Sequence, residues 1–281
     1  MSDQEPRLEY LFWLSRPRFW LYLGGPVLVG LVYASDSLAE LFTPFNLALF
    51  LYFLVPANVM LYGVNDVFDA DIDELNPKKD EKETRYSGDR AVLGAILLST
   101  VAGIAFLPFL PTESALWLGA FYFLGIEYSA PPLRFKTTPV FDSVTNGLYV
   151  IPGIVAYTAV SSQPLPLVAI VGAWVWAMAM HTFSAIPDIE PDREAGISTT
   201  ATVLGEKRTL VYCTLCWVAA AVAFYVVSPL VALLMAVFPV LSAALLYADA
   251  DIERAYWWYP LINTFLGMIL TMGGLWMIIY G

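Results

Sequence analysis

The chain has 281 residues, of which 59% are hydrophobic and only 14% are charged. An average soluble domain carries about 25% charged residues, so this composition excludes an ordinary soluble enzyme and predicts a polytopic membrane protein. The formal net charge of -11 argues against nucleic acid as a partner, and we interpret it as a sign of a high-salt cytoplasm, where salt screens carboxylate repulsion.

Apolar runs long enough to span a bilayer, roughly 17 to 25 residues each, recur along the whole chain. They predict an all-α membrane protein, a nine-transmembrane-helix bundle in one integral domain over residues 1–281. The predicted spans are 19–34, 47–64, 91–110, 114–130, 141–160, 165–187, 209–227, 229–247 and 257–280. The segment before the first span is expected to lie along the membrane surface and not to be a cleavable signal.

The basic residues predict the orientation of these spans. All 14 lysines and arginines precede the first span or follow the second, fourth, sixth or eighth. Because Lys and Arg near membrane ends are retained on the cytoplasmic side, we expect a multi-pass protein of the cell membrane. Its N-terminus would be cytoplasmic and its C-terminus extracellular.

A first acidic motif, "NDVFDADID" at residues 65–73, follows the second span. Asn65, Asp69 and Asp73 stand four apart, so on a helix their side chains share one face. Asp71 points to nearly the opposite side. The motif is predicted to end a helix on the cytoplasmic side.

A second acidic motif, "PDIEPDREAG", follows the sixth span, with Asp188 and Asp192 again four apart and Glu190 turned away. Both motifs follow an even-numbered span, so both fall on the cytoplasmic face. We therefore expect two helix ends, at about 65–73 and 188–192, to bring their oxygen-bearing side chains together.

Carboxylates gathered at low dielectric repel one another, so such a cluster either takes up protons or binds a cation. Oxygen ligands select a hard ion, and Mg²⁺ held by carboxylates keeps positions open for phosphate oxygens. The sequence thus predicts Mg²⁺ at Asn65, Asp69, Asp73, Asp188 and Asp192, with a diphosphate bridging the two motifs.

The stretch "YSAPPLRFKTT" at residues 128–138 lies in the next predicted cytoplasmic loop. Arg134 and Lys136 are candidates to clamp the diphosphate, and Tyr128 is a candidate hydrogen-bond donor to it. The alternative is that Arg134 and Lys136 only anchor the loop on the cytoplasmic side.

A diphosphate at the mouth of an apolar bundle suggests an isoprenyl diphosphate, whose allylic cation needs a dry, aromatic surround. His181 lies seven residues before Asp188, two helical turns deeper, and is a candidate catalytic proton acceptor. Alternatively, it is a hydrogen-bonded histidine that shapes the pocket. Asn58, seven residues before Asn65, is expected to line the same pocket.

With both motifs in view, the sequence resembles the UbiA-type intramembrane prenyltransferases. The motifs fit that family's N-D-x-x-D-x-x-x-D and D-x-x-x-D-x-x-x-G patterns, and the resemblance covers nearly the whole chain. It implies a nine-helix bundle, Mg²⁺-dependent prenyl transfer and an active site open laterally to lipid. It also implies metal and diphosphate roles for Asn65, Asp69, Asp73, Asp188 and Asp192.

Within that family, "LYGVNDVFDADIDELNPKK" and "AYWWYPLINTFLGMILTMGGLW" look like the haloarchaeal lycopene elongase branch. This implies transfer from dimethylallyl diphosphate to lycopene, a hydrophobic acceptor taken from the bilayer, with or without hydration. Rival acceptors are an archaeal glycerol lipid, a quinone precursor and a chlorin. The run "NPKKDEKETRY" after the first motif departs from the quinone-pathway pattern.

A cation-coupled membrane transporter is the alternative from another class, although transport sites usually lie near the bilayer midplane. Cys213 and Cys216 fall inside an apolar run, so we expect inert core residues. Gly24, Gly25, Gly273 and Gly274 are expected to permit close helix packing.

Overall fold

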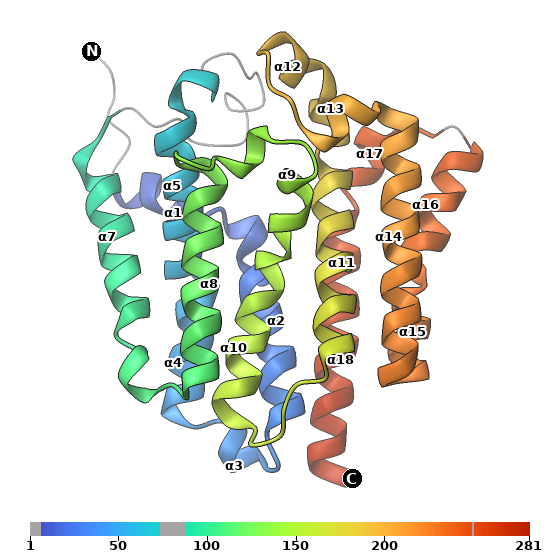
Figure 1. The fold of residues 1–281 in the computed structure, drawn as a ribbon. Helices are drawn as coiled ribbons and strands as arrows, with labels where there is room; N and C mark the ends of the chain where they lie inside the picture. Colours follow the sequence, from blue (N-terminus) through green and yellow to red (C-terminus); the bar gives the residue numbers. More distant parts are fainter. Residues whose placement is uncertain (1–6, 74–87, 249) are drawn as a thin grey trace.

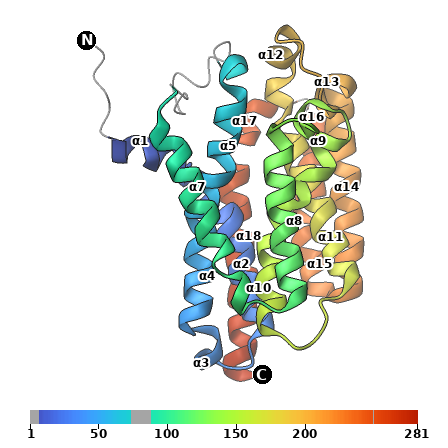
Figure 2. The same ribbon diagram turned by 60° about the vertical axis from the view of Figure 1, so that its left-hand side comes forward.

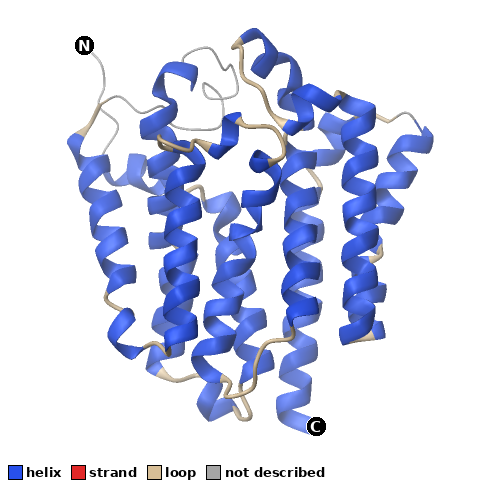
Figure 3. Ribbon diagram, viewed as in Figure 1, coloured by secondary structure: helices blue, strands red, loops and turns tan. Residues whose placement is uncertain are grey.

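The computed structural model describes residues 7–73, 88–248 and 250–281, and these residues form helices and loops with no strand (Figure 3). The α-helices are α1 (Arg7–Leu14), α2 (Trp20–Ala34), α3 (Leu38–Leu41), α4 (Pro44–Leu54), α5 (Pro56–Asp73), α7 (Arg90–Ile104), α8 (Thr112–Ser129), α9 (Phe141–Val144), α10 (Ile151–Val160), α11 (Leu167–Ser184), α12 (Ile189–Glu194), α13 (Thr200–Leu204), α14 (Glu206–Val227), α15 (Pro229–Met235), α16 (Val237–Ala248), α17 (Ile252–Tyr256) and α18 (Tyr259–Tyr280). Short 3₁₀ helices join some of them: η1 (Pro17–Phe19), η2 (Leu107–Phe109), η3 (Phe135–Thr137), η4 (Thr145–Val150) and η5 (Ile186–Asp188). The prediction of an all-α bundle is confirmed.

Among the described residues, seven helical segments are long and apolar enough to cross a membrane. They are 44–69, 90–109, 141–160, 167–194, 206–227, 229–248 and 252–280. The two other predicted spans correspond to α2, which has only 15 residues, and α8, which carries Glu113 and Glu127. Both run along the bundle beside the others (Figure 1), but the count of nine spans stays a prediction.

The long helices lie side by side along one axis, whereas α1 lies across this axis (Figure 2). The end of α5 and the helices α12 and α13 lie at the same end of the bundle (Figure 1). The C-terminal end of α18 lies at the opposite end. The two acidic motifs therefore belong to one end, although which end faces the cytoplasm remains a prediction from the basic residues.

Local sequence signals set several helix starts. The Thr43 side chain accepts from the Asn46 backbone N–H at 3.2 Å, and Pro44 occupies the first turn of α4. Asp89 caps α7 by accepting from the Ala91 backbone N–H at 2.9 Å. Between α4 and α5, Pro56 can donate no backbone hydrogen bond, so the apolar run from 44 to 69 divides into two helices.

Glycine allows helices α2 and α10 to approach each other closely. A Cβ added to Gly30 of α2 would lie 2.3 Å from the carbonyl oxygen of Gly153 on α10. A Cβ added to Gly153 would lie 2.7 Å from the carbonyl oxygen of Pro26. Only glycine fits at either position, so α2 and α10 pack backbone against backbone.

Two hydrophobic clusters hold the bundle together. The first gathers side chains of α2, α4, α5, α8 and α10 around fully buried Phe53 and Phe121. The second lies among α11, α14, α16 and α18, where Phe183 stacks on Tyr259 with ring centroids 4.2 Å apart. Residues from both halves of the chain line a large internal cavity, described next.

Candidate active site

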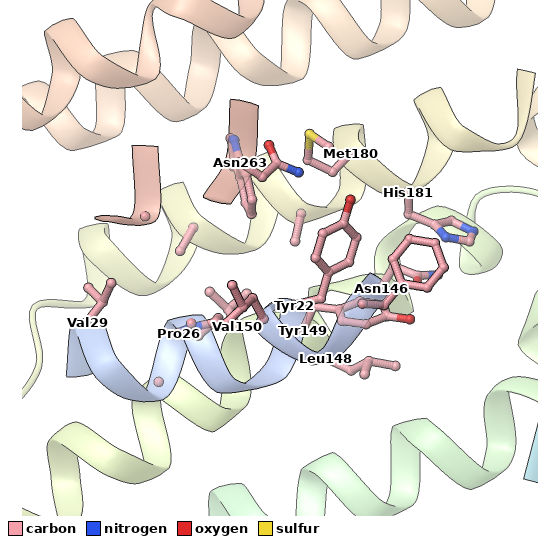
Figure 4. Close-up of a pocket in the computed structure, with 18 of the residues that line it drawn as sticks. Tyr22, Pro26, Val29, Asn146, Leu148, Tyr149, Val150, Met180, His181 and Asn263 are labelled. Atoms are coloured by element: carbon pink, nitrogen blue, oxygen red, sulfur yellow. The ribbon is translucent and has the colours of Figure 1, made fainter. Parts of the chain in front are cut away.

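The cavity has a volume of about 1090 Å³, above the roughly 300 to 1,000 Å³ of ordinary small-molecule sites. Its lining reaches from Asp188 at the acidic end to Pro166 at the start of α11, the full length of a helix that spans about 27 Å. Figure 4 shows part of the lining, where apolar side chains such as Leu148 and Val150 alternate with Tyr22, Asn146 and His181. The site thus has a polar mouth and a long apolar interior.

Helix α5 presents two first-motif residues to this mouth. Asn65 and Asp69 both line the cavity, and the Asn65 amide donates to Ser129 Oγ of α8 at 2.9 Å. Asp66, between them in sequence, points elsewhere and accepts from the Arg16 guanidinium at 2.8 Å. The side chains of Asp71 and Asp73 lie outside the described residues.

Two positively charged side chains lie against the Asp69 carboxylate. The Lys136 ammonium is in direct contact with one carboxylate oxygen, and Arg134 lies 3.4 Å from the other. Arg134 also donates to the backbone carbonyl of Phe68 at 3.1 Å, and its own backbone is left-handed, with φ 42°. Lys136 lines the cavity, whereas Arg134 lies just beside it. The mouth therefore combines carboxylates with positive charge, and Asp69 itself is only 3% exposed.

The second motif comes to the mouth through η5 and α12. Asp188 ends the 3₁₀ turn, Asp192 lies in the first turn of α12, and both line the cavity. The Glu190 side chain is 76% exposed and pairs with Arg193 at 2.7 Å on the outside. As the spacing predicts, Glu190 is turned away from the two aspartates.

A buried aspartate that the sequence analysis missed ties the second motif to the rest of the bundle. Asp142 of α9 accepts from the backbone N–H of Thr200 at 2.9 Å and from its hydroxyl at 2.5 Å. Thr200 begins α13, directly after the second motif, and its hydroxyl oxygen also accepts from the Val140 backbone N–H at 2.7 Å. Buried carboxylates need such partners, so Asp142 fixes the position of this segment.

His181 and Tyr128 form a polar pair on the cavity wall. The Tyr128 hydroxyl and His181 Nε2 are 2.9 Å apart, and both residues line the cavity. His181 lies in the last turn of α11, so it is deeper than Asp188 on the same side. The role of Tyr128 as a hydrogen-bond donor to the diphosphate stays a prediction.

Two sequence predictions about the pocket are wrong. Asn58 is fully buried away from the cavity, where its amide donates to the carbonyls of Phe53 and Leu54 at the break between α4 and α5. Gly25 lines the cavity with nothing within 4 Å of an added Cβ, so it widens the cavity instead of packing helices. Spacing along a helix cannot distinguish a pocket face from a helix junction.

The donor set at the mouth fits a hard divalent cation. Asn65, Asp69, Asp188 and Asp192 offer only oxygen atoms and line one cavity. Within the described part of the chain, no three His, Cys, Asp or Glu side chains are close enough to hold a metal by themselves. A cation here would therefore depend on further oxygen ligands, such as phosphate.

Comparison with known proteins identifies close relatives over almost the whole chain. The sequence profile of the UbiA prenyltransferase family matches residues 23–266. A lycopene elongase/hydratase from Haloferax volcanii is 58% identical over 275 residues, covering 98% of this chain and 91% of the relative. Another, from Halobacterium salinarum, is 55% identical over 277 residues, covering 97% and 99%.

The fold is also similar to solved structures. A UbiA homologue from Archaeoglobus fulgidus, bound to DMAPP and Mg²⁺, matches with a TM-score of 0.76 at 17% identity. The match covers 97% of this chain and 100% of that chain. A digeranylgeranylglyceryl phosphate synthase structure matches with a TM-score of 0.68 at 15% identity. At these identities the likeness concerns the fold alone.

Proposed function

Because this chain belongs to the UbiA prenyltransferase family, and is thus a membrane prenyltransferase, we propose that it extends lycopene by transferring a prenyl group from dimethylallyl diphosphate. The observation that carries the proposal is the cavity, which joins an acidic mouth to an apolar interior about as long as α11. Relatives with 55% and 58% identity are named lycopene elongase/hydratase, which supports the same acceptor.

The proposed donor site is the mouth. Asn65, Asp69, Asp73, Asp188 and Asp192 would hold Mg²⁺, which when bound neutralises the diphosphate and favours its departure. Lys136 and Arg134, now beside Asp69, would contact the remaining phosphate oxygens. In support of this role, the buried Arg134 Nε has no hydrogen-bond acceptor among the described residues.

The proposed reaction begins when the allylic carbon–oxygen bond breaks, with both electrons leaving on the diphosphate. A terminal alkene of the acceptor then attacks the allylic carbon, which forms a carbon–carbon bond and leaves a tertiary cation on the acceptor. His181, which lies inside the mouth and is hydrogen-bonded through Nε2 to the Tyr128 hydroxyl, would receive a proton from that cation. Aromatic walls and exclusion of bulk water protect the cation meanwhile.

The cavity lining favours a long hydrocarbon over the rival acceptors. A glycerol lipid headgroup, a quinone precursor or a chlorin would bring polar atoms that need partners beyond the mouth. Far from the mouth, the lining includes Val29, Leu165, Pro166 and Met272. The carboxylates of the described lining all belong to the mouth end, unlike a transport site at the midplane.

The test is transfer by purified protein in lipid with labelled dimethylallyl diphosphate, Mg²⁺ and lycopene. We expect C45 and then C50 products, and Asp69→Asn or Asp188→Asn should lower turnover at least about 100-fold. Transfer to a glycerol lipid, an aromatic acid or a chlorin alcohol in place of lycopene would contradict the acceptor. Absence of transfer to any isoprenoid acceptor would contradict the proposal as a whole.

A further inference from the structure

The cavity contains a second set of polar groups, separate from the acidic mouth, on three different helices. Asn263 of α18, Tyr22 of α2 and Trp176 of α11 all line it, and the side chains of Tyr22 and Asn263 are neighbours on its wall (Figure 4). Figure 4 shows Tyr22 and Asn263 on the same stretch of lining as His181. These groups share a cavity whose remaining wall is largely apolar.

Two of these groups are buried without a partner. Asn263 Oδ1 accepts no hydrogen bond, and Trp176 Nε1 donates none, among the described residues. A buried polar atom without a partner is destabilising, so a free acceptor and a free donor lining the same cavity indicate a ligand that both donates and accepts. A water molecule or a hydroxyl group does both.

Tyr22, Asn263 and Trp176 lie just inside the mouth, as their positions along their helices indicate. Tyr22 is in the first turn of α2, and Asn263 is four residues, about 6 Å, into α18. Trp176 lies five residues before His181 on α11, about 7.5 Å deeper. The acceptor end that reacts with the prenyl group must occupy this same level, between the mouth and the apolar interior.

The reaction proposed above leaves a tertiary cation that has two possible fates. Loss of a proton gives an alkene. Addition of water forms a carbon–oxygen bond from a water lone pair, after which one water proton leaves to the released diphosphate, and the product is a tertiary alcohol. The choice depends on whether a water molecule is held with a lone pair toward the cation.

Resting on that proposed function, we propose that Asn263 and Trp176, with Tyr22 orienting the Asn263 amide, hold the water molecule that adds to the acceptor cation. Asn263 Oδ1 accepts one hydrogen of this water and Trp176 Nε1–H donates to one lone pair, which leaves the second lone pair for the cation. The set therefore determines the ratio of hydroxylated to unsaturated product.

The test compares full-length wild type with Asn263→Leu and Trp176→Phe in lipid, supplied with dimethylallyl diphosphate, Mg²⁺ and lycopene in water enriched in oxygen-18. The readout is the ratio of alcohol to alkene, which does not depend on total turnover. Wild type should incorporate solvent oxygen into its alcohol, and each variant should lower the ratio about tenfold, as expected for one lost hydrogen bond to the water.

Two control variants remove hydroxyls that do not serve this water. Thr214→Val changes a residue of α14 outside the cavity lining, whose hydroxyl donates to the Leu210 carbonyl at 2.8 Å. Tyr259→Phe removes a buried hydroxyl of the aromatic cluster, which has no hydrogen-bond partner among the described residues and lies outside the cavity lining. Both should keep the wild-type ratio.

An unchanged ratio in Trp176→Phe and Asn263→Leu would overturn the inference, as would a wild type that transfers the prenyl group and makes only alkene. If Asn263→Leu does not fold, the Trp176→Phe ratio decides alone. These results leave the proposed function standing, whereas absence of any transfer by wild type would remove that function itself.

Discussion

The Arg16 guanidinium donates to the Asp66 carboxylate at 2.8 Å, although fifty residues separate them, and it also lies 4.5 Å from the ring centre of Tyr62. The Asp66 side chain is only 2% exposed. This pair fixes the segment before α2 against the start of the first acidic motif. Arg16 lines the cavity at the mouth and Asp66 does not, so the pair links the cavity wall to the helix behind it.

Arg16→Gln should destabilise the protein by about 3 to 5 kcal/mol, because it removes a charged hydrogen-bond donor from the buried Asp66 carboxylate. The double variant Arg16→Met with Asp66→Leu should recover most of that loss. Thermal unfolding in detergent measures both. Glu190→Gln is the control, because its exposed pair with Arg193 should contribute under about 1 kcal/mol. Equal losses for the two pairs would contradict this explanation.

Lys136→Gln should raise KM for the allylic diphosphate by roughly 10- to 100-fold, the effect of losing one charge-assisted contact to phosphate. Steady-state kinetics with varied dimethylallyl diphosphate measures it. Arg208→Gln, an exposed basic residue in the first turn of α14, serves as the matched charge control. A KM that stays at the wild-type value in Lys136→Gln would show that Lys136 serves only to neutralise Asp69.

Removal of divalent cations with a chelator should abolish diphosphate release. Mg²⁺ should restore it, and Zn²⁺ should not, because the described donor set at the mouth is all oxygen. Release of inorganic diphosphate is the measurement. The control is the same reaction with chelator that has already been saturated with Mg²⁺. Full turnover in excess chelator would exclude a metal role for the acidic motifs.

Gly25→Leu should lower transfer to lycopene about tenfold, because the new side chain projects into the cavity where nothing lies within 4 Å of a Cβ. Short isoprenoid acceptors should be affected less. The control is Gly119→Leu, which is equally open around its Cβ but lies outside the cavity lining. The measurement is product formed against acceptor chain length, and a loss that does not vary with length would argue against an acceptor channel here.

The sequence predicted the bundle because long apolar runs, together with basic residues confined to every second connection between them, are strong and additive signals. It also predicted that Glu190 turns away from Asp188 and Asp192, since a spacing of four residues on a helix is a local property. Length and hydropathy identify seven of the nine predicted spans among the described residues, because α2 is short and α8 carries glutamates.

What the sequence could not predict depends on contacts between distant helices. Asp142 reads as an isolated acid, and only folding brings it to Thr200, 58 residues later. Asn263 is likewise one polar residue in an apolar run until α2 brings Tyr22 beside it. Each is a polar residue inside a predicted span, which is a functional-site signal even without a known partner.

The described carboxylates of the cavity all lie at one end, which has a consequence for an acceptor that is reactive at both tips. A symmetrical, rod-shaped acceptor can place only one of its two ends at the mouth each time it binds. An acceptor that is to be extended at both ends must therefore dissociate after the first transfer, reorient in the lipid and bind again. Diluting the enzyme with lipid should therefore prolong the lifetime of the intermediate that is extended at one end only.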